Sequence, residues 1–192
     1  PLIVHYSGLE MLKRDCILNK NFTNLYNKFC PGPLTFILKL KKNSKISKFV
    51  TNKKKTLAVR FPSHPKTKSL LKILNYPLAA PSANISSRVS PVTRNHVKEE
   101  FGKKIKYIIE GGLSKIGLES TIINLTRKPE ILRVGSIDIS KLSKVLKKKL
   151  IYRKKTYMKV PGQNRLHYSP GIPLKMNCKE ASLDEAFILV KK

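Results

Sequence analysis

Hydrophobic and polar positions along this chain form two kinds of pattern. Runs rich in β-branched and aromatic side chains predict strands, and apolar positions spaced by three and four predict helices. We expect strands at 2–4, 34–40, 56–61, 76–80, 105–110, 122–125 and 131–133. We expect helices after residue 7 and over 22–29, 66–75, 93–101 and 138–146. Because strands and helices alternate irregularly and no internal repeat occurs, the pattern favours an α/β fold with a mixed sheet over a regular doubly wound one.

Small polar residues and glycines mark where several of these elements begin or end. Ser7 and Glu10 have the spacing of a capping box in front of the first helix. The Pro-Gly-Pro run at 31–33 should stop the second helix abruptly. Thr93 is expected to cap the helix that Gly102 ends.

The patterning changes after residue 147. The stretch 151–166 is polar, basic and without periodicity, which is typical of a linker, and the apolar residues 186–190 are expected to begin a strand of another domain. The chain opens on Pro1 rather than Met, so we expect it to be a fragment of a larger coding sequence. We therefore divide it into a domain at 1–147, a linker at 148–173 and the start of a truncated domain at 174–192.

Composition narrows the class of protein. A chain of 192 residues is long enough to bury a hydrophobic core without disulfide bonds or a structural metal. Its three cysteines have the spacing of neither a disulfide framework nor a zinc site, which fits a reducing, cytoplasmic setting. No apolar run reaches the length of a membrane span. The net charge of +29 favours a polyanionic partner, but 32 of the 40 basic residues are lysines spread along the chain, so a general compositional bias explains most of the charge.

Candidate functional residues lie in five separate short segments of the sequence, here called islands. Ser82, Asn84 and Ser90 follow an apolar strand, and taken alone such a cluster is more often a turn than a ligand site. The other islands are His5, Arg60, the run 119–121 and Arg133. Together they offer cationic clamps and neutral hydrogen-bond donors, but no residue is assigned as nucleophile or base.

Six motifs, in this order and spacing, resemble the threonylcarbamoyl-AMP synthase (YrdC-like) family. They are Pro1-Leu2-Ile3-Val4-His5, Cys30-Pro31-Gly32-Pro33-Leu34-Thr35, Ala58-Val59-Arg60-Phe61-Pro62 with His64-Pro65, Ala80-Pro81-Ser82-Ala83-Asn84, Gly117-Leu118-Glu119-Ser120-Thr121 and Ile131-Leu132-Arg133. The resemblance covers 1–137, and His167-Tyr168-Ser169-Pro170 with Pro173-Leu174 resembles the linker of the longer, two-domain subfamily.

This resemblance implies a twisted mixed sheet with helices around a large basic concave pocket, followed by an extended linker. It also implies a nucleotidyltransferase that joins L-threonine, bicarbonate and ATP into threonylcarbamoyl-AMP with release of pyrophosphate. The product then serves the transferase machinery that makes the t6A modification of tRNA.

Site residues follow from the same resemblance. It implies that threonine is bound by His5, Arg60, Ala80 and Ser120. It implies that ATP is contacted by Thr56, Ser82, Asn84, Ser90, Arg133 and the linker residue Tyr168, which would act as a lid. Mg²⁺ is expected with ATP, held by phosphate oxygens and water, with no protein metal site and no tightly bound organic cofactor.

Three departures accompany the resemblance. The family's first strands, which include a basic phosphate-gripping motif, would precede Pro1, so we expect the chain as it stands to be inactive. Ser87 stands where the family usually has glycine, and Val134 where it usually has proline.

Two alternative functions remain open. The charge suits a double-stranded RNA or tRNA-binding module that uses the same basic concavity. A carbamoyltransfer module of the hydrogenase-maturation type would share the fold, but such modules lie in much longer chains with zinc-finger and acylphosphatase-like segments, and the 167–173 linker argues against it.

Overall fold

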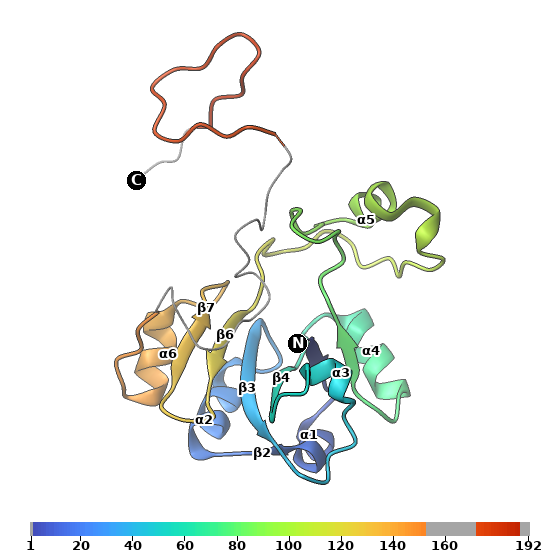
Figure 1. Ribbon diagram of the computed structural model, residues 1–192, viewed down its shortest axis with the longest axis vertical. Coiled ribbons are helices and arrows are strands. Elements are labelled where there is room, and N and C mark those ends of the chain that lie inside the picture. Colours follow the sequence, from blue (N-terminus) through green and yellow to red (C-terminus); the bar gives the residue numbers. More distant parts are fainter. Residues whose placement is uncertain (1, 153–171, 189–192) are drawn as a thin grey trace.

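A seven-stranded mixed sheet forms the centre of the computed structural model, which describes residues 2–152 and 172–188 (Figure 1). Its strands are β1 (Ile3–His5), β2 (Cys16–Ile17), β3 (Leu34–Leu40), β4 (Thr56–Arg60), β5 (Leu78–Ala80), β6 (Thr121–Asn124) and β7 (Glu130–Arg133). The order is β5-β1-β4-β3-β6-β7, with β2 paired to β3. The β1–β4 and β3–β6 pairs are parallel and the others antiparallel. The expected mixed sheet is therefore confirmed.

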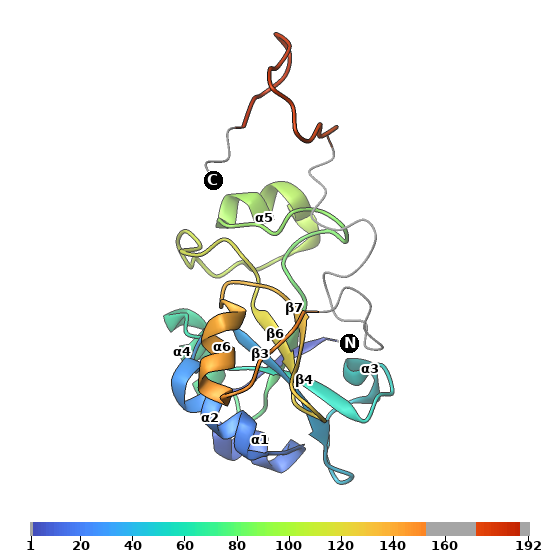
Figure 2. The ribbon, with the colours of Figure 1, turned by 90° about the vertical axis from the view of Figure 1, so that its left-hand side faces the viewer.

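Six α-helices and one short 3₁₀ helix accompany the described strands. They are α1 (Leu9–Asp15), α2 (Lys20–Phe29), α3 (Lys48–Thr51), α4 (Pro65–Ile73), α5 (Arg94–Phe101), the 3₁₀ helix η1 (Gly102–Lys104) and α6 (Ile139–Leu146). Helices α1, α2 and α6 lie on one side of the sheet, whereas α5 stands apart from it and buries no residue (Figure 2).

Alternation along β4 separates the two faces of the sheet. Leu57 and Val59 point into the main core, which α1, α2 and α6 complete. Ala58 belongs to a second, smaller apolar cluster on the opposite face. Because side chains alternate along a strand, Arg60 shares the face of Ala58. The small cluster therefore forms the floor of the face that carries the predicted arginine.

The predicted helix ends are partly confirmed. Thr93 caps α5 by accepting a hydrogen bond from the His96 amide at 3.2 Å, and Gly102 ends that helix with a φ of 53°. The capping box at the first helix is wrong. Gly8 is the N-cap of α1, and Glu10 pairs with Lys13 at 2.6 Å instead of reaching back to the backbone.

The strand predicted at 105–110 is also wrong. The chain is irregular from 105 to 120, and Tyr107 and Ile109 are 78% and 61% exposed. A strand needs a neighbour to satisfy its backbone groups, and within 2–152 no strand pairs with this run. The expected strand at 186–190 is not found at 186–188, and 189–190 lie outside the described residues.

Beyond the sheet, no helix within the described ranges is both long and apolar enough to cross a membrane. Most of the predicted linker lies outside the described residues, and 172–188 contain neither helix nor strand.

Candidate functional site

A row of polar side chains, two of them predicted site residues, crosses one end of the sheet. His5, the last residue of β1, pairs in register with Arg60, the last residue of β4. Arg60 pairs on its other side with Thr35, near the start of β3. Side chains at paired positions point to the same face, so the three share one edge of the small apolar floor. Strand order brings together residues that lie far apart in the sequence.

Ser120, directly before β6, is the hydrogen-bonding centre of this row. Its hydroxyl Oγ lies 2.7 Å from Thr35 Oγ1 and accepts a hydrogen bond from Arg133 Nη2 at 3.1 Å. Arg133 Nε donates to the Ser120 carbonyl, also at 3.1 Å. Two bonds to one residue fix the plane of the guanidinium, so Ser120 orients Arg133.

Gly135 permits this close arrangement. A Cβ atom at that position would lie 2.5 Å from the Thr121 amide nitrogen and would also meet the backbone of Ser120. The chain that leaves β7 can therefore pass against the Ser120 peptide only because residue 135 has no side chain.

Arg60 has the electrostatic character of an anion clamp. Its Nε donates to the Gly32 carbonyl at 3.3 Å, but its terminal nitrogens donate to no protein acceptor among the described residues. Burial, and then the positive charge of Arg133, lower the pKa of Arg60. Two guanidinium groups that repel each other in a half-buried site favour an anion between them.

Neighbouring titratable groups are kept neutral. Burial and then the charge of Arg60 lower the pKa of His5, whose ring Nδ1 lies 3.3 Å from the Leu78 carbonyl. Because a carbonyl only accepts, Nδ1 carries the hydrogen. Burial raises the pKa of Cys30 to about 12, against an opposing effect of Arg60. The Cys30 thiol is thus not poised as a nucleophile at neutral pH.

The small polar residues after β5 form a loop beside this row. Asn84 Nδ2 donates to the carbonyls of Ile85 and Arg88, both at 3.0 Å, so Asn84 shapes the loop. Its Oδ1 is buried without a hydrogen-bond partner among the described residues. Ser90 Oγ donates to Glu119 Oε1 at 2.5 Å, which ties the loop to the residue preceding Ser120.

Four predicted site residues lie outside this hydrogen-bonded group. Ala80 ends β5 opposite Ile3, and Ser82 is exposed in the loop that follows. Thr56 begins β4, on the face of Arg60 but at the other end of the strand, about 13 Å away at 3.3 Å per residue. Tyr168 lies outside the described residues.

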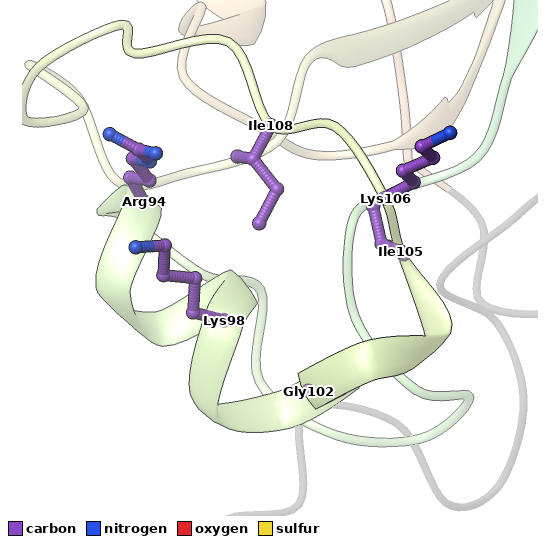
Figure 3. Close-up of a pocket in the computed structure, with 6 residues that line it drawn as sticks. All are labelled: Arg94, Lys98, Gly102, Ile105, Lys106 and Ile108. Carbon is purple, nitrogen blue, oxygen red and sulfur yellow. The ribbon is translucent and has the colours of Figure 1, made fainter.

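Two cavities lie away from the row. One of about 300 Å³ separates α5 from the segment that follows it, and its lining consists of Arg94, Lys98, Gly102, Ile105, Lys106 and Ile108 (Figure 3). The other, of about 200 Å³, lies between α4 and the Pro31 and Pro62 turns. Neither is lined by Arg60 or Ser120, so the large basic concavity stays a prediction.

No metal cage is found in the described ranges, where no three His, Cys, Asp or Glu side chains gather.

Two residues of the site were assigned to neither the threonine nor the ATP subsite by the sequence interpretation. Thr35 and Glu119 stood inside the quoted motifs, yet both bond to predicted site residues. A polar residue in a strand that is otherwise buried is the signal that marks Thr35, since such a hydroxyl needs a partner.

The profile of a protein family that comprises Sua5, YciO and YrdC, described as telomere recombination, matches residues 1–135. The chain belongs to this family. The threonylcarbamoyl-AMP synthase of Pyrococcus abyssi is 38% identical to this chain over 181 residues, which cover 89% of this chain and 52% of that protein. The synthase of Schizosaccharomyces pombe is 36% identical over 203 residues, covering 88% and 50%. The chain thus spans about half the length of these relatives.

A solved structure of the family confirms the fold. The crystal structure of Pyrococcus abyssi Sua5 complexed with L-threonine superposes with a TM-score of 0.80 at 35% identity, over 88% of this chain and 51% of that one. The YrdC-like twisted sheet expected from the motifs is therefore the observed fold.

Proposed function

We propose that this chain contributes to the synthesis of L-threonylcarbamoyl-AMP from L-threonine, bicarbonate and ATP, with release of pyrophosphate. The observation that carries the proposal is Arg60, half-buried beside Arg133, with terminal nitrogens that bond to no acceptor among the described residues. The matching relatives bear the name of this synthase, and the related Sua5 crystal structure holds L-threonine.

In the proposed threonine subsite, Arg60 binds the carboxylate with both terminal nitrogens, since a planar guanidinium matches a carboxylate geometrically. His5 lies beside it in register, and its neutral ring adds no second charge next to Arg60. The backbone at Ala80 and the hydroxyl of Ser120 complete the subsite.

The proposed ATP subsite extends from the polar loop along the same face. Ser82, Asn84 and Ser90 form its nucleotide wall, Arg133 neutralises phosphate charge, and Thr56 contacts the far end. Tyr168 closes over the nucleotide. Mg²⁺ would enter with ATP, held by phosphate oxygens and water rather than by protein ligands.

The chemistry needs positioning more than it needs a protein nucleophile. The threonine amine and bicarbonate form a carbamate and water. A carbamate oxygen then attacks the α-phosphorus, and the bond between that phosphorus and the bridging oxygen of pyrophosphate breaks. Fixed cations lower the cost of the charge that develops, and holding both reactants in place supplies the rest.

The setting follows from the same proposal. The chain divides at 147 and 173 into the synthase domain, a linker and the start of a further domain. The protein acts in the cytoplasm. Its product passes to the transferase machinery that makes the t6A modification. Bound tRNA or double-stranded RNA is a second candidate, favoured by the charge of +29.

Pyrophosphate release from ATP tests the proposal. The assay uses the chain alone and the chain joined to the parts of the Pyrococcus abyssi synthase that it does not span. We expect release from the joined protein only when threonine and bicarbonate are both present. Release that is indifferent to threonine contradicts the proposal.

Arg60→Ala in the joined protein is the matched variant. We expect it to weaken threonine binding by about 10- to 100-fold, because a buried charged hydrogen-bond pair is lost. Threonine affinity is measured by calorimetry. An unchanged affinity would remove Arg60 from the subsite.

A further inference from the structure

Thr35 is a buried hydroxyl at the middle of the site row. It is 0% exposed, lies on β3 between Arg60 on β4 and Ile122 on β6, and is bonded to Ser120. The remainder of the buried part of β3 is apolar. Burying a hydroxyl costs free energy unless it is hydrogen-bonded, so the bond from Thr35 to Ser120 is the feature that accounts for a polar residue at this position.

The direction of the Thr35 hydrogen bond follows from counting hydrogens. Among the described residues, Thr35 Oγ1 has Ser120 Oγ as its single hydrogen-bond partner, at 2.7 Å. If Ser120 donated, the Thr35 hydrogen would be buried without an acceptor there, which is costly. Thr35 therefore donates.

This direction determines what Ser120 has left to offer. Its Oγ accepts from Thr35 and from Arg133 Nη2, because a guanidinium never accepts. Both lone pairs of the hydroxyl are then used, and the two incoming bonds fix the direction of the remaining Ser120 hydrogen. That hydrogen is free to be donated to a ligand.

We propose that Thr35 is a positioning residue that turns the Ser120 hydroxyl into an oriented donor for bound L-threonine. The inference rests on the proposed function, since it takes threonine as the ligand. Thr35 does not touch the substrate in this arrangement but acts through Ser120. The same hydroxyl also helps to hold Arg133, so Thr35 joins the threonine and ATP subsites.

Calorimetric titration of the joined protein described above with L-threonine tests the inference. Thr35→Val keeps the shape of the side chain and removes the donor, and we expect the dissociation constant for threonine to rise about tenfold. Thr35→Ser restores the hydroxyl and should restore affinity to within about twofold of the wild type. Thr51→Val is the matched control, because Thr51 is 2% exposed with its hydroxyl bonded to the Lys48 carbonyl in α3. It should leave threonine affinity unchanged.

A double-mutant cycle separates positioning from packing. If Thr35 acts through Ser120, Thr35→Val should cause no further loss of affinity in a Ser120→Ala background. An equal loss in both backgrounds overturns the inference, as does unchanged affinity in Thr35→Val or failure of Thr35→Ser to restore it. A wild-type joined protein that binds no threonine overturns the proposed function and this inference together, whereas the preceding results overturn the inference alone.

Discussion

Two arginines at one end of the sheet show how much of the site depends on strand order. Arg60 and Arg133 are separated by more than seventy positions, yet the charge of one lowers the pKa of the other. Both were candidate residues in the sequence, and the family resemblance implied their ligand roles. Their proximity could not be predicted from periodicity, because the pairing order β4-β3-β6-β7 is set by long-range packing rather than by any local pattern.

His5 provides a test of this electrostatic arrangement. Burial and Arg60 lower its pKa below 6.5, so the unfolded chain takes up a proton at a higher pH than the folded one. The stability that neutral His5 allows is complete above the pKa that His5 has in the unfolded chain. It is lost as the pH falls from there towards the lower pKa that His5 has in the folded chain. We expect the free energy of unfolding, measured with urea, to decrease between about pH 7.5 and 5.

His5→Asn is the control for this prediction, since the amide can still donate to the Leu78 carbonyl but does not titrate. The variant should lose part of the pH dependence. An identical pH profile in both proteins would show that His5 is not the group responsible.

At the scale of elements, predictions held where the local signal agreed with the long-range partners. The apolar runs of β3 and β4 and the stop after α2 were found as expected. The run 105–110 has equally good strand propensity but no strand beside it within 2–152, so propensity alone did not make a strand. The short elements β2 and α3 are too brief for any periodic signal.

The polar loop after β5 contains a residue whose backbone conformation is unfavourable for any side chain larger than that of glycine. Ser87 has a φ of 76°, in the left-handed region that favours glycine, and the motifs had already marked it as a departure from glycine. We expect Ser87→Gly to raise the free energy of unfolding by up to about 1 kcal/mol, since relief of strain exceeds the added chain entropy. Urea unfolding at neutral pH measures the change.

Ser87→Ala is the matched variant, because alanine keeps the Cβ and the strain. It should give no gain in stability. Equal stabilisation by alanine and glycine would assign the effect to the serine hydroxyl rather than to the backbone.

At the scale of the whole molecule, two of the lysine runs lie away from the site. The run Lys53–Lys55 precedes β4, and Lys41-Lys42 follows β3, so both lie at the end of this hairpin opposite Thr35 and Arg60. A third run, 147–149, follows α6. The interpretation of the charge as a compositional bias fits the placement of the runs at 41–42 and 53–55, since neither lies at the end of the hairpin that carries Arg60.

This separation predicts two independent binding behaviours. Duplex RNA should bind through scattered lysines, so its affinity should fall at least about tenfold between 50 and 200 mM salt as counterions are released, whereas threonine affinity should change much less. Replacing Lys53, Lys54 and Lys55 together with Gln should weaken RNA binding and leave threonine binding intact, and Arg60→Ala should do the reverse. Fluorescence anisotropy of a labelled RNA duplex and calorimetry with threonine measure the two affinities. If Arg60→Ala abolished RNA binding as well, the two ligands would share one site, and the double-stranded RNA module would become the better account of the basic face.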